Sequence, residues 1–132
     1  MGISDRIEDA AFLWRQGRRE SGLLLACTAV AARASSKYPG KGDREAFGAL
    51  LQDSLSMQIS TEFRGEQWPI ERLLYKWIRC QLVHNASIPM DIIIDDGLGE
   101  ELALRAGGAP EYVLKLSPGW FSFLIDVANQ TG

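Results

Sequence analysis

The hydrophobic spacing of this 132-residue chain changes once, near residue 85, from a helical period to a strand period. Before that point, apolar residues recur at intervals of three and four, as on the buried face of an amphipathic helix. After it, a β-branched run at 90–94 and alternating residues from Leu102 indicate short strands. Pro89 lies at the change, and proline cannot continue a helix. The chain is therefore expected to be mainly helical, with a small strand unit near its end.

Five helices follow from this spacing and from the residues that start and stop helices. We expect them over 4–16 and 19–35, from Asp43 to about 57, from Pro69 to about 84, and from Ser117-Pro118 onward. Ser117 is expected to cap the last helix, with Pro118 as its first residue. The predicted fold class is an up-and-down helical bundle with a small antiparallel β-hairpin unit at about 90–116. Gly107-Gly108 is its expected turn and 112–116 its returning strand; residues 59–67 show neither pattern clearly.

Length and charge limit the classes of protein that this chain can represent. At 132 residues we expect one domain over 1–132, and no apolar run approaches the length of a membrane helix. The polar, acidic N-terminus and only two cysteines indicate a cytoplasmic protein with reduced thiols. Residues 1–84 carry 12 basic and 10 acidic residues, and residues 85–132 carry 2 and 7. This distribution is not that of a general nucleic-acid coat protein, but it permits a local basic surface in the first part.

The single histidine, His84, follows Arg79 at the end of a predicted amphipathic helix. A histidine can take the proton of a ribose 2′-hydroxyl or protonate the leaving oxygen, and an arginine can stabilise the charge on a phosphate. Together the two side chains suit RNA cleavage without a metal or cofactor. The alternative is that His84 only caps or packs at a helix end, which is common for a lone histidine there.

Helical geometry places Arg72, Lys76 and Arg79 in one outward-facing basic stripe. His84 follows Arg79 by five residues, about 140° round a regular helix. The two side chains can therefore reach one target only if the helix bends or a second copy supplies one of them. We expect a homodimer, because a two-fold axis would bring two arginines and two histidines together.

The segment from Arg79 to Asn85, Arg-Cys-Gln-Leu-Val-His-Asn, resembles the Arg-x4–6-His signature of HEPN domains. The small-residue helix from Gly22, the Gly42–Phe47 segment and the Leu73–Cys80 helix extend the resemblance over roughly 18–85. Cys80 follows the arginine, where many members carry a polar residue. The resemblance implies a dimeric helical bundle and, in many members, a metal-independent ribonuclease of toxin–antitoxin, phage-defence or RNA-processing systems.

Carried onto this chain, the resemblance makes Arg79 and His84 the catalytic pair. Arg72, Lys76 and Asn85 would be the RNA-binding residues. Arg72 and Lys76 would steer RNA, and Asn85 would orient the histidine or cap the helix. The expected partners are a second copy, RNA, and a cognate antitoxin or nucleotidyltransferase; no DNA or membrane partner is expected. The alternative from another class is a non-catalytic HEPN-like module that dimerises or binds a partner protein.

Other residue groups have simpler interpretations. The acidic residues of 91–101 do not follow the spacing of an EF-hand, and we expect them to be solvated. The cysteines form no CxxC pair, so no metal site is expected. The four tryptophans lie within apolar helical patterns and are expected in the core.

Overall fold

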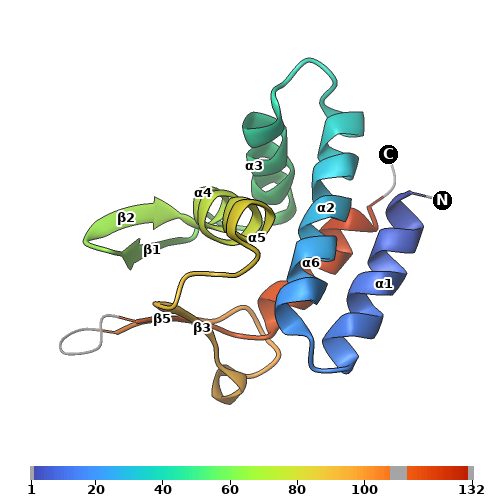
Figure 1. The fold of residues 1–132 in the computed structure, drawn as a ribbon. Helices are drawn as coiled ribbons and strands as arrows, with labels where there is room; N and C mark the ends of the chain where they lie inside the picture. Colours follow the sequence, from blue (N-terminus) through green and yellow to red (C-terminus); the bar gives the residue numbers. More distant parts are fainter. Residues whose placement is uncertain (1, 108–112, 131–132) are drawn as a thin grey trace.

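The computed structural model describes residues 2–107 and 113–130, and it is mainly helical. The helices pack against one another, and two small sheets lie to one side of them (Figure 1). Buried residues from α1, α2, α3, the helix after residue 69, β5 and α6 form one hydrophobic core. This confirms the predicted fold class. Within the described residues, no helix is both long and apolar enough to cross a membrane.

The first two helices, α1 (Ile3–Arg15) and α2 (Arg19–Lys37), form a closely packed pair. Gly22 makes the approach possible, because a Cβ at this position would lie 3.1 Å from the Ala10 carbonyl oxygen. Three of the five alanines of α2, Ala26, Ala29 and Ala34, are also buried, whereas Ala31 is half-buried and Ala32 is exposed. α3 (Asp43–Ser54) and α6 (Gly119–Ala128) pack on other faces of α2. Trp14 of α1 stacks on Phe121 of α6, with ring centroids 4.1 Å apart, so the first and last helices meet.

Residues 70–85 form one continuous helix of three segments, two α-helical and one π-helical, and we call it the central helix. It consists of α4 (Ile70–Leu73), a π-helical segment η1 (Leu74–Cys80) and α5 (Gln81–Asn85). Pro69 precedes its first residue, consistent with the predicted start. Ala86, which ends it, is left-handed with φ 63°. The π segment was not anticipated from the sequence.

A two-stranded antiparallel hairpin occupies the segment that the sequence pattern left unassigned. β1 (Ser60–Phe63) pairs with β2 (Glu66–Pro69), Ser60 opposite Pro69 and Phe63 opposite Glu66. Arg64 and Gly65 form the turn with φ 54° and 80°. Positive φ at both central residues is the requirement of a type I′ turn, which matches the twist of a hairpin.

The predicted strand unit is a three-stranded sheet of β3 (Ile92–Ile94), β4 (Leu104–Ala106) and β5 (Leu114–Leu116). β4 and β5 pair antiparallel, as predicted. β3 was expected to belong to an antiparallel unit, but it pairs parallel with β5, which is the central strand. The reason is that 95–103 cross over before the chain returns. The Gly108 half of the expected turn and the start of the returning strand at 112 lie outside the described residues.

Ser117 does not cap α6 with its side chain, contrary to the sequence-based prediction. Its buried hydroxyl donates to the Glu101 carbonyl oxygen at 2.5 Å and accepts from the Ala103 amide at 2.9 Å. Pro118 is the N-cap, and α6 begins at Gly119. Ser117 therefore joins the crossover to the start of α6.

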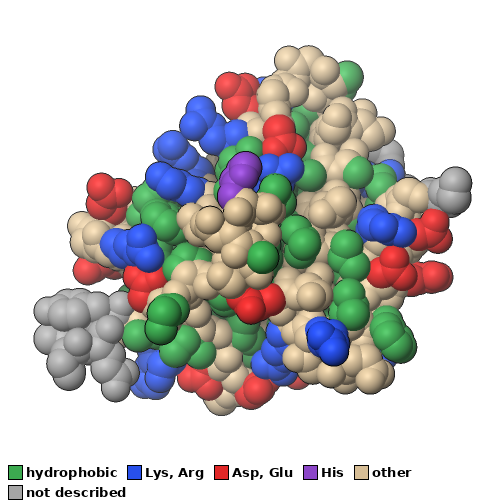
Figure 2. Space-filling view, in the orientation of Figure 1, with side chains coloured by type: hydrophobic (Ala, Val, Ile, Leu, Met, Phe, Trp, Pro, Cys, Tyr) green, Lys and Arg blue, Asp and Glu red, His purple; other side chains and the backbone are tan. Residues whose placement is uncertain are grey.

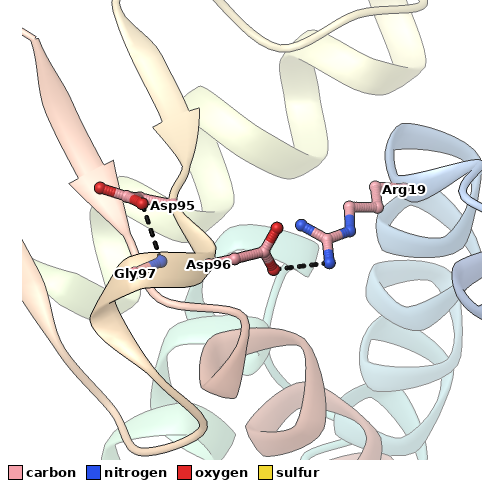
Figure 3. Close-up of polar contacts among 4 residues, drawn as sticks. All are labelled: Arg19, Asp95, Asp96 and Gly97. Carbon is pink, nitrogen blue, oxygen red and sulfur yellow. Dashed lines mark hydrogen bonds and ion pairs between the residues drawn. The ribbon is translucent and has the colours of Figure 1, made fainter.

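The acidic residues of 91–101 make separate contacts instead of one cluster. Asp96 of the short 3₁₀ helix η2 (Asp96–Leu98) pairs with Arg19 of α2 at 2.7 Å (Figure 3). Asp95 accepts a hydrogen bond from the Gly97 amide at 2.9 Å, and Asp91 binds Arg64 (Figure 3). No group of metal-binding side chains occurs within 2–107 and 113–130. Asp96 thus joins the strand unit to α2, and Asp91 joins it to the β1–β2 hairpin.

Candidate functional site

The π segment decides where the predicted site residues of the central helix lie. Its backbone bonds run from residue i to i+5, so each residue turns by less than the 100° of an α-helix. Arg72 and Lys76 are exposed on the outer face, as predicted. Arg79 was expected in the same stripe, and this is wrong: its side chain is 23% exposed and contacts α3. The slower turning of the π segment explains the displacement. Single-turn π insertions in α-helices often lie at functional sites.

Arg79 is held by the first residue of α3. Its Nη1 lies 2.9 Å from Oδ2 of Asp43, and its guanidinium carbon lies 5.4 Å from the ring centre of Tyr75. The Tyr75 hydroxyl donates to the same Asp43 oxygen at 2.9 Å. Burial and this hydrogen bond raise the pKa of Tyr75 to about 12, so Tyr75 stays protonated at neutral pH. Arg79 is thus oriented and partly neutralised within its own chain.

His84 has the opposite environment. Its side chain is exposed near the end of α5, and no hydrogen bond or ion pair joins that side chain to another described residue. Figure 2 shows the histidine at the surface with lysine and arginine side chains beside it. An exposed imidazole without an internal partner is free to exchange a proton with a bound ligand.

Asn85 does not orient the histidine, although the sequence suggested this role. Its Nδ2 donates to Oε1 of Gln81 at 2.6 Å, which turns the amide toward the preceding turn of the helix. Arg79 and His84 likewise share no described hydrogen bond or ion pair within one chain. Within the described residues, the three side chains are therefore neighbours in sequence without a shared hydrogen bond or ion pair.

A basic groove lies between α3 and the start of the central helix, and we call it the α3–α4 groove. Its inner hollow, about 120 Å³, is lined by Arg44, Gly48, Trp68, Glu71, Arg72, Tyr75 and Lys76. Its outer hollow, about 470 Å³, is lined by Lys41, Arg44, Glu45, Gly48, Ala49, Gln52, Glu71 and Arg72. The two hollows adjoin, because they share four lining residues, Arg44, Gly48, Glu71 and Arg72.

The charge of the groove is positive. Four cations, Lys41, Arg44, Arg72 and Lys76, face two carboxylates, Glu45 and Glu71. No ion pair joins any of the four cations to another described residue. Lys76 instead lies over Trp68 and Trp77, with its Nζ 5.3 Å from each ring centre. Unpaired cations beside aromatic rings are the components of single-strand binding sites.

The sequence predicted two of these groove cations and missed the rest. Arg72 and Lys76 were found because they share one helix face. Lys41 and Arg44 come from a different segment, and only the packing of α3 on α4 brings them alongside. Lys41 precedes α3 by two residues and Arg44 lies in its first turn, so no helix-face pattern places the two together. Trp68 was expected in the core, but it is half-buried and lines the inner hollow.

Another hollow, about 290 Å³, lies beside the β1–β2 turn. Its cation, Arg64, forms a bidentate ion pair with Asp91 at 2.7 and 2.9 Å and lies 4.5 Å from the ring centre of Trp77. Because the Arg64 charge is already paired with Asp91, the hollow is a weaker candidate for a ligand site than the α3–α4 groove.

Comparison with known proteins adds a family and no activity. The model of a family described as Rv1289 matches residues 2–106. No curated protein and no solved structure matches the chain. The matched range includes the whole α3–α4 groove, Arg79 and His84, and ends before β5 and α6.

Proposed function

The chain belongs to the Rv1289 family, and from its site we propose that it is a metal-independent endoribonuclease that binds RNA in the α3–α4 groove. The observation that carries the proposal is that one helix presents an exposed, unpartnered imidazole, His84, together with two unpaired groove cations, Arg72 and Lys76. Phosphate groups bind such cations without regard to sequence. The imidazole then supplies the proton transfer that cleavage needs.

The reaction follows from the chemistry of ribose. His84 removes the proton of a 2′-hydroxyl, and the 2′ oxygen attacks the adjacent phosphorus. The bond from phosphorus to the 5′ oxygen breaks, and that oxygen takes a proton from a second imidazole. The products are a 2′,3′-cyclic phosphate and a 5′-hydroxyl. Because each chain has a single histidine, a homodimer is the simplest source of the second imidazole.

Arg79 has the role of stabilising charge on the phosphorus oxygens. In the structure the Arg79 guanidinium forms an ion pair with Asp43, so RNA must displace that carboxylate. A phosphate can do so because it offers the planar guanidinium two oxygens for a bidentate contact. This exchange would make cleavage depend on the strength of the Arg79–Asp43 ion pair.

The test is incubation of the pure protein with mixed-sequence RNA in EDTA. We expect fragments that end in 2′,3′-cyclic phosphate, and no cleavage of DNA of the same sequence, since DNA lacks the 2′-hydroxyl. His84→Ala should slow cleavage by about 100-fold or more. It should leave the thermal unfolding curve unchanged, because His84 is exposed. Asn129→Ala, at an exposed residue at the end of α6, is the matched control and should cleave like the wild type. Intact RNA, or equal cleavage by His84→Ala, would contradict the proposal.

The dimer can be tested separately by refolding wild-type and His84→Ala chains together. If cleavage needs one imidazole from each chain, mixed dimers are inactive, and about one quarter of the wild-type activity should remain at equal input. About one half of the activity, with mixed dimers demonstrated by mass, would place a complete site in each chain and contradict the shared site.

A second candidate is a non-catalytic module that binds a partner protein. The Arg79–Asp43 ion pair favours it, because a neutralised arginine suits a structural role. Under this alternative RNA stays intact, and Asp43→Asn destabilises the chain without creating RNA affinity.

A further inference from the structure

The inner hollow of the α3–α4 groove contains one carboxylate, Glu71, among its cations. Glu71 is half-buried, lines both hollows and has no described ion pair or side-chain hydrogen bond to another residue. Burial raises its pKa, while its own backbone amide and nearby Arg72 lower it in part. A negative group at this position weakens the attraction of the groove for phosphate. The first turn of α4 favours a carboxylate, and at the wall of the hollow Glu71 also offers hydrogen-bond acceptors to a ligand.

The walls around Glu71 are suited to a flat ring. Trp68 and Tyr75 line the inner hollow on the side of the central helix and β2. Gly48 lies opposite on α3, and a Cβ there would be 3.8 Å from Cγ of Glu71. With no side chain at residue 48, the space beside the carboxylate stays open. Aromatic walls of this kind hold unstacked bases of single strands.

The outer hollow is suited to the charged part of the same ligand. It is larger, about 470 Å³, and exposed Lys41 and Arg44 line it together with Arg72. A base in the inner hollow would leave its sugar and phosphate among these cations. The two adjoining hollows therefore match the two halves of a nucleotide.

Resting on the proposed function, we infer that the α3–α4 groove is a guanine-nucleotide subsite: Glu71 accepts two hydrogen bonds from the base, and the outer cations bind its phosphate. A carboxylate offers only acceptors. Guanine is the base whose Watson–Crick edge presents two adjacent donors, N1–H and N2–H. Adenine, cytosine and uracil each present a single donor there. A matched bidentate contact discriminates between bases by about tenfold or more.

The experiment compares the binding of GMP, AMP, CMP and UMP to the full chain by calorimetry, with wild type and Glu71→Gln. The wild type should bind GMP about tenfold more tightly than AMP. Glu71→Gln should lose this preference while its affinity for AMP stays equal or rises, because a negative charge has left the groove. A role in folding alone would not change the two affinities in opposite directions.

Glu45→Gln is the matched control, since it removes the same charge from the outer hollow. It should keep the preference for GMP. Equal binding of the four nucleotides by the wild type, binding of none of them, or the same loss of preference in both variants would overturn the inference. Cleavage of RNA without guanine preference would overturn this inference alone. GMP preference without cleavage would overturn the nuclease and leave the subsite.

Discussion

Asp43, the first residue of α3, lies 2.9 Å from the guanidinium of Arg79 in the π segment of the central helix. The same oxygen accepts the hydrogen bond of the Tyr75 hydroxyl. One carboxylate thus joins α3 to the central helix through two side chains. The first prediction follows from removing that charge.

Asp43→Asn should free Arg79 and increase RNA affinity. The cost in stability should be about 1 kcal/mol or less, because Asp43 is 46% exposed and such pairs are screened by solvent. The pKa of Tyr75 should fall from about 12 but stay above its ordinary value, because burial is the largest cause of the shift. Filter binding and a tyrosinate absorbance titration measure the two effects.

Asp53→Asn is the control for this change, since Asp53 accepts the hydrogen bond of another tyrosine, Tyr38, and raises its pKa. It should alter the titration of Tyr38 and leave RNA affinity alone. Equal RNA binding by wild type and Asp43→Asn would show that Arg79 does not face the ligand.

The two cysteines should differ in reactivity. Burial raises the pKa of Cys27 to about 12, so its thiol is both inaccessible and protonated. Cys80 is half-buried and free. An aromatic disulfide reagent should therefore modify Cys80 in the native protein and Cys27 only after unfolding. With Cys80→Ser, any reaction of the native chain at neutral pH would show that the core opens readily around Cys27.

Gly119→Ala should be among the most destabilising single-methyl changes in this chain. A Cβ there would lie 2.4 Å from the Glu100 carbonyl oxygen and 2.5 Å from that of Glu101, both backbone atoms. We expect a loss of about 3 kcal/mol in urea unfolding. Gly48→Ala is the contrast, because its Cβ has room within α3 and alanine favours helix by up to about 1 kcal/mol. Similar unfolding midpoints for both variants would contradict the packing described for the start of α6.

The Arg64–Asp91 ion pair should stabilise the chain only at pH values at which Asp91 is ionised. The hydrogen bonds from Arg64 hold the pKa of Asp91 below its ordinary value. A depressed carboxylate pKa contributes stability above the unfolded-state value, about pH 4, and loses it as pH falls through the folded-state value. Asp91→Asn should therefore be less stable than the wild type at pH 7, by about 1 kcal/mol at most. The two unfolding curves should converge on acidification; a constant difference down to pH 2 would mean that the effect is not the ion pair.

The helices were predictable because each carries a long apolar period, and α1, α2 and the start of the central helix lie within two residues of their predicted bounds. The β1–β2 hairpin was missed because its four-residue strands are too short for alternation to show, although Arg64-Gly65 is a turn signal. The parallel pairing of β3 with β5 depends on a crossover that no local pattern records.

In the site, the exposure of His84, Arg72 and Lys76 could be predicted from their positions along one helix. The partner of Arg79 does not, because regular winding was assumed through a segment that winds differently. The groove combines α3, β2 and α4, so its cations and aromatic residues come together only in the tertiary structure.

The π segment makes the layout of the central helix depend on the number of its residues as well as on their identity. Seven residues have the backbone hydrogen bonds of a π-helix, from residue i to i+5. The side chains of Ile70, Leu73, Leu74 and Ile78 are buried in the core. Deleting one residue would let the helix return to regular winding, and the side chains that follow would be reassigned between Asp43, the groove and solvent. An insertion or deletion in this short stretch would thus alter several contacts at once, with every side chain chemically intact.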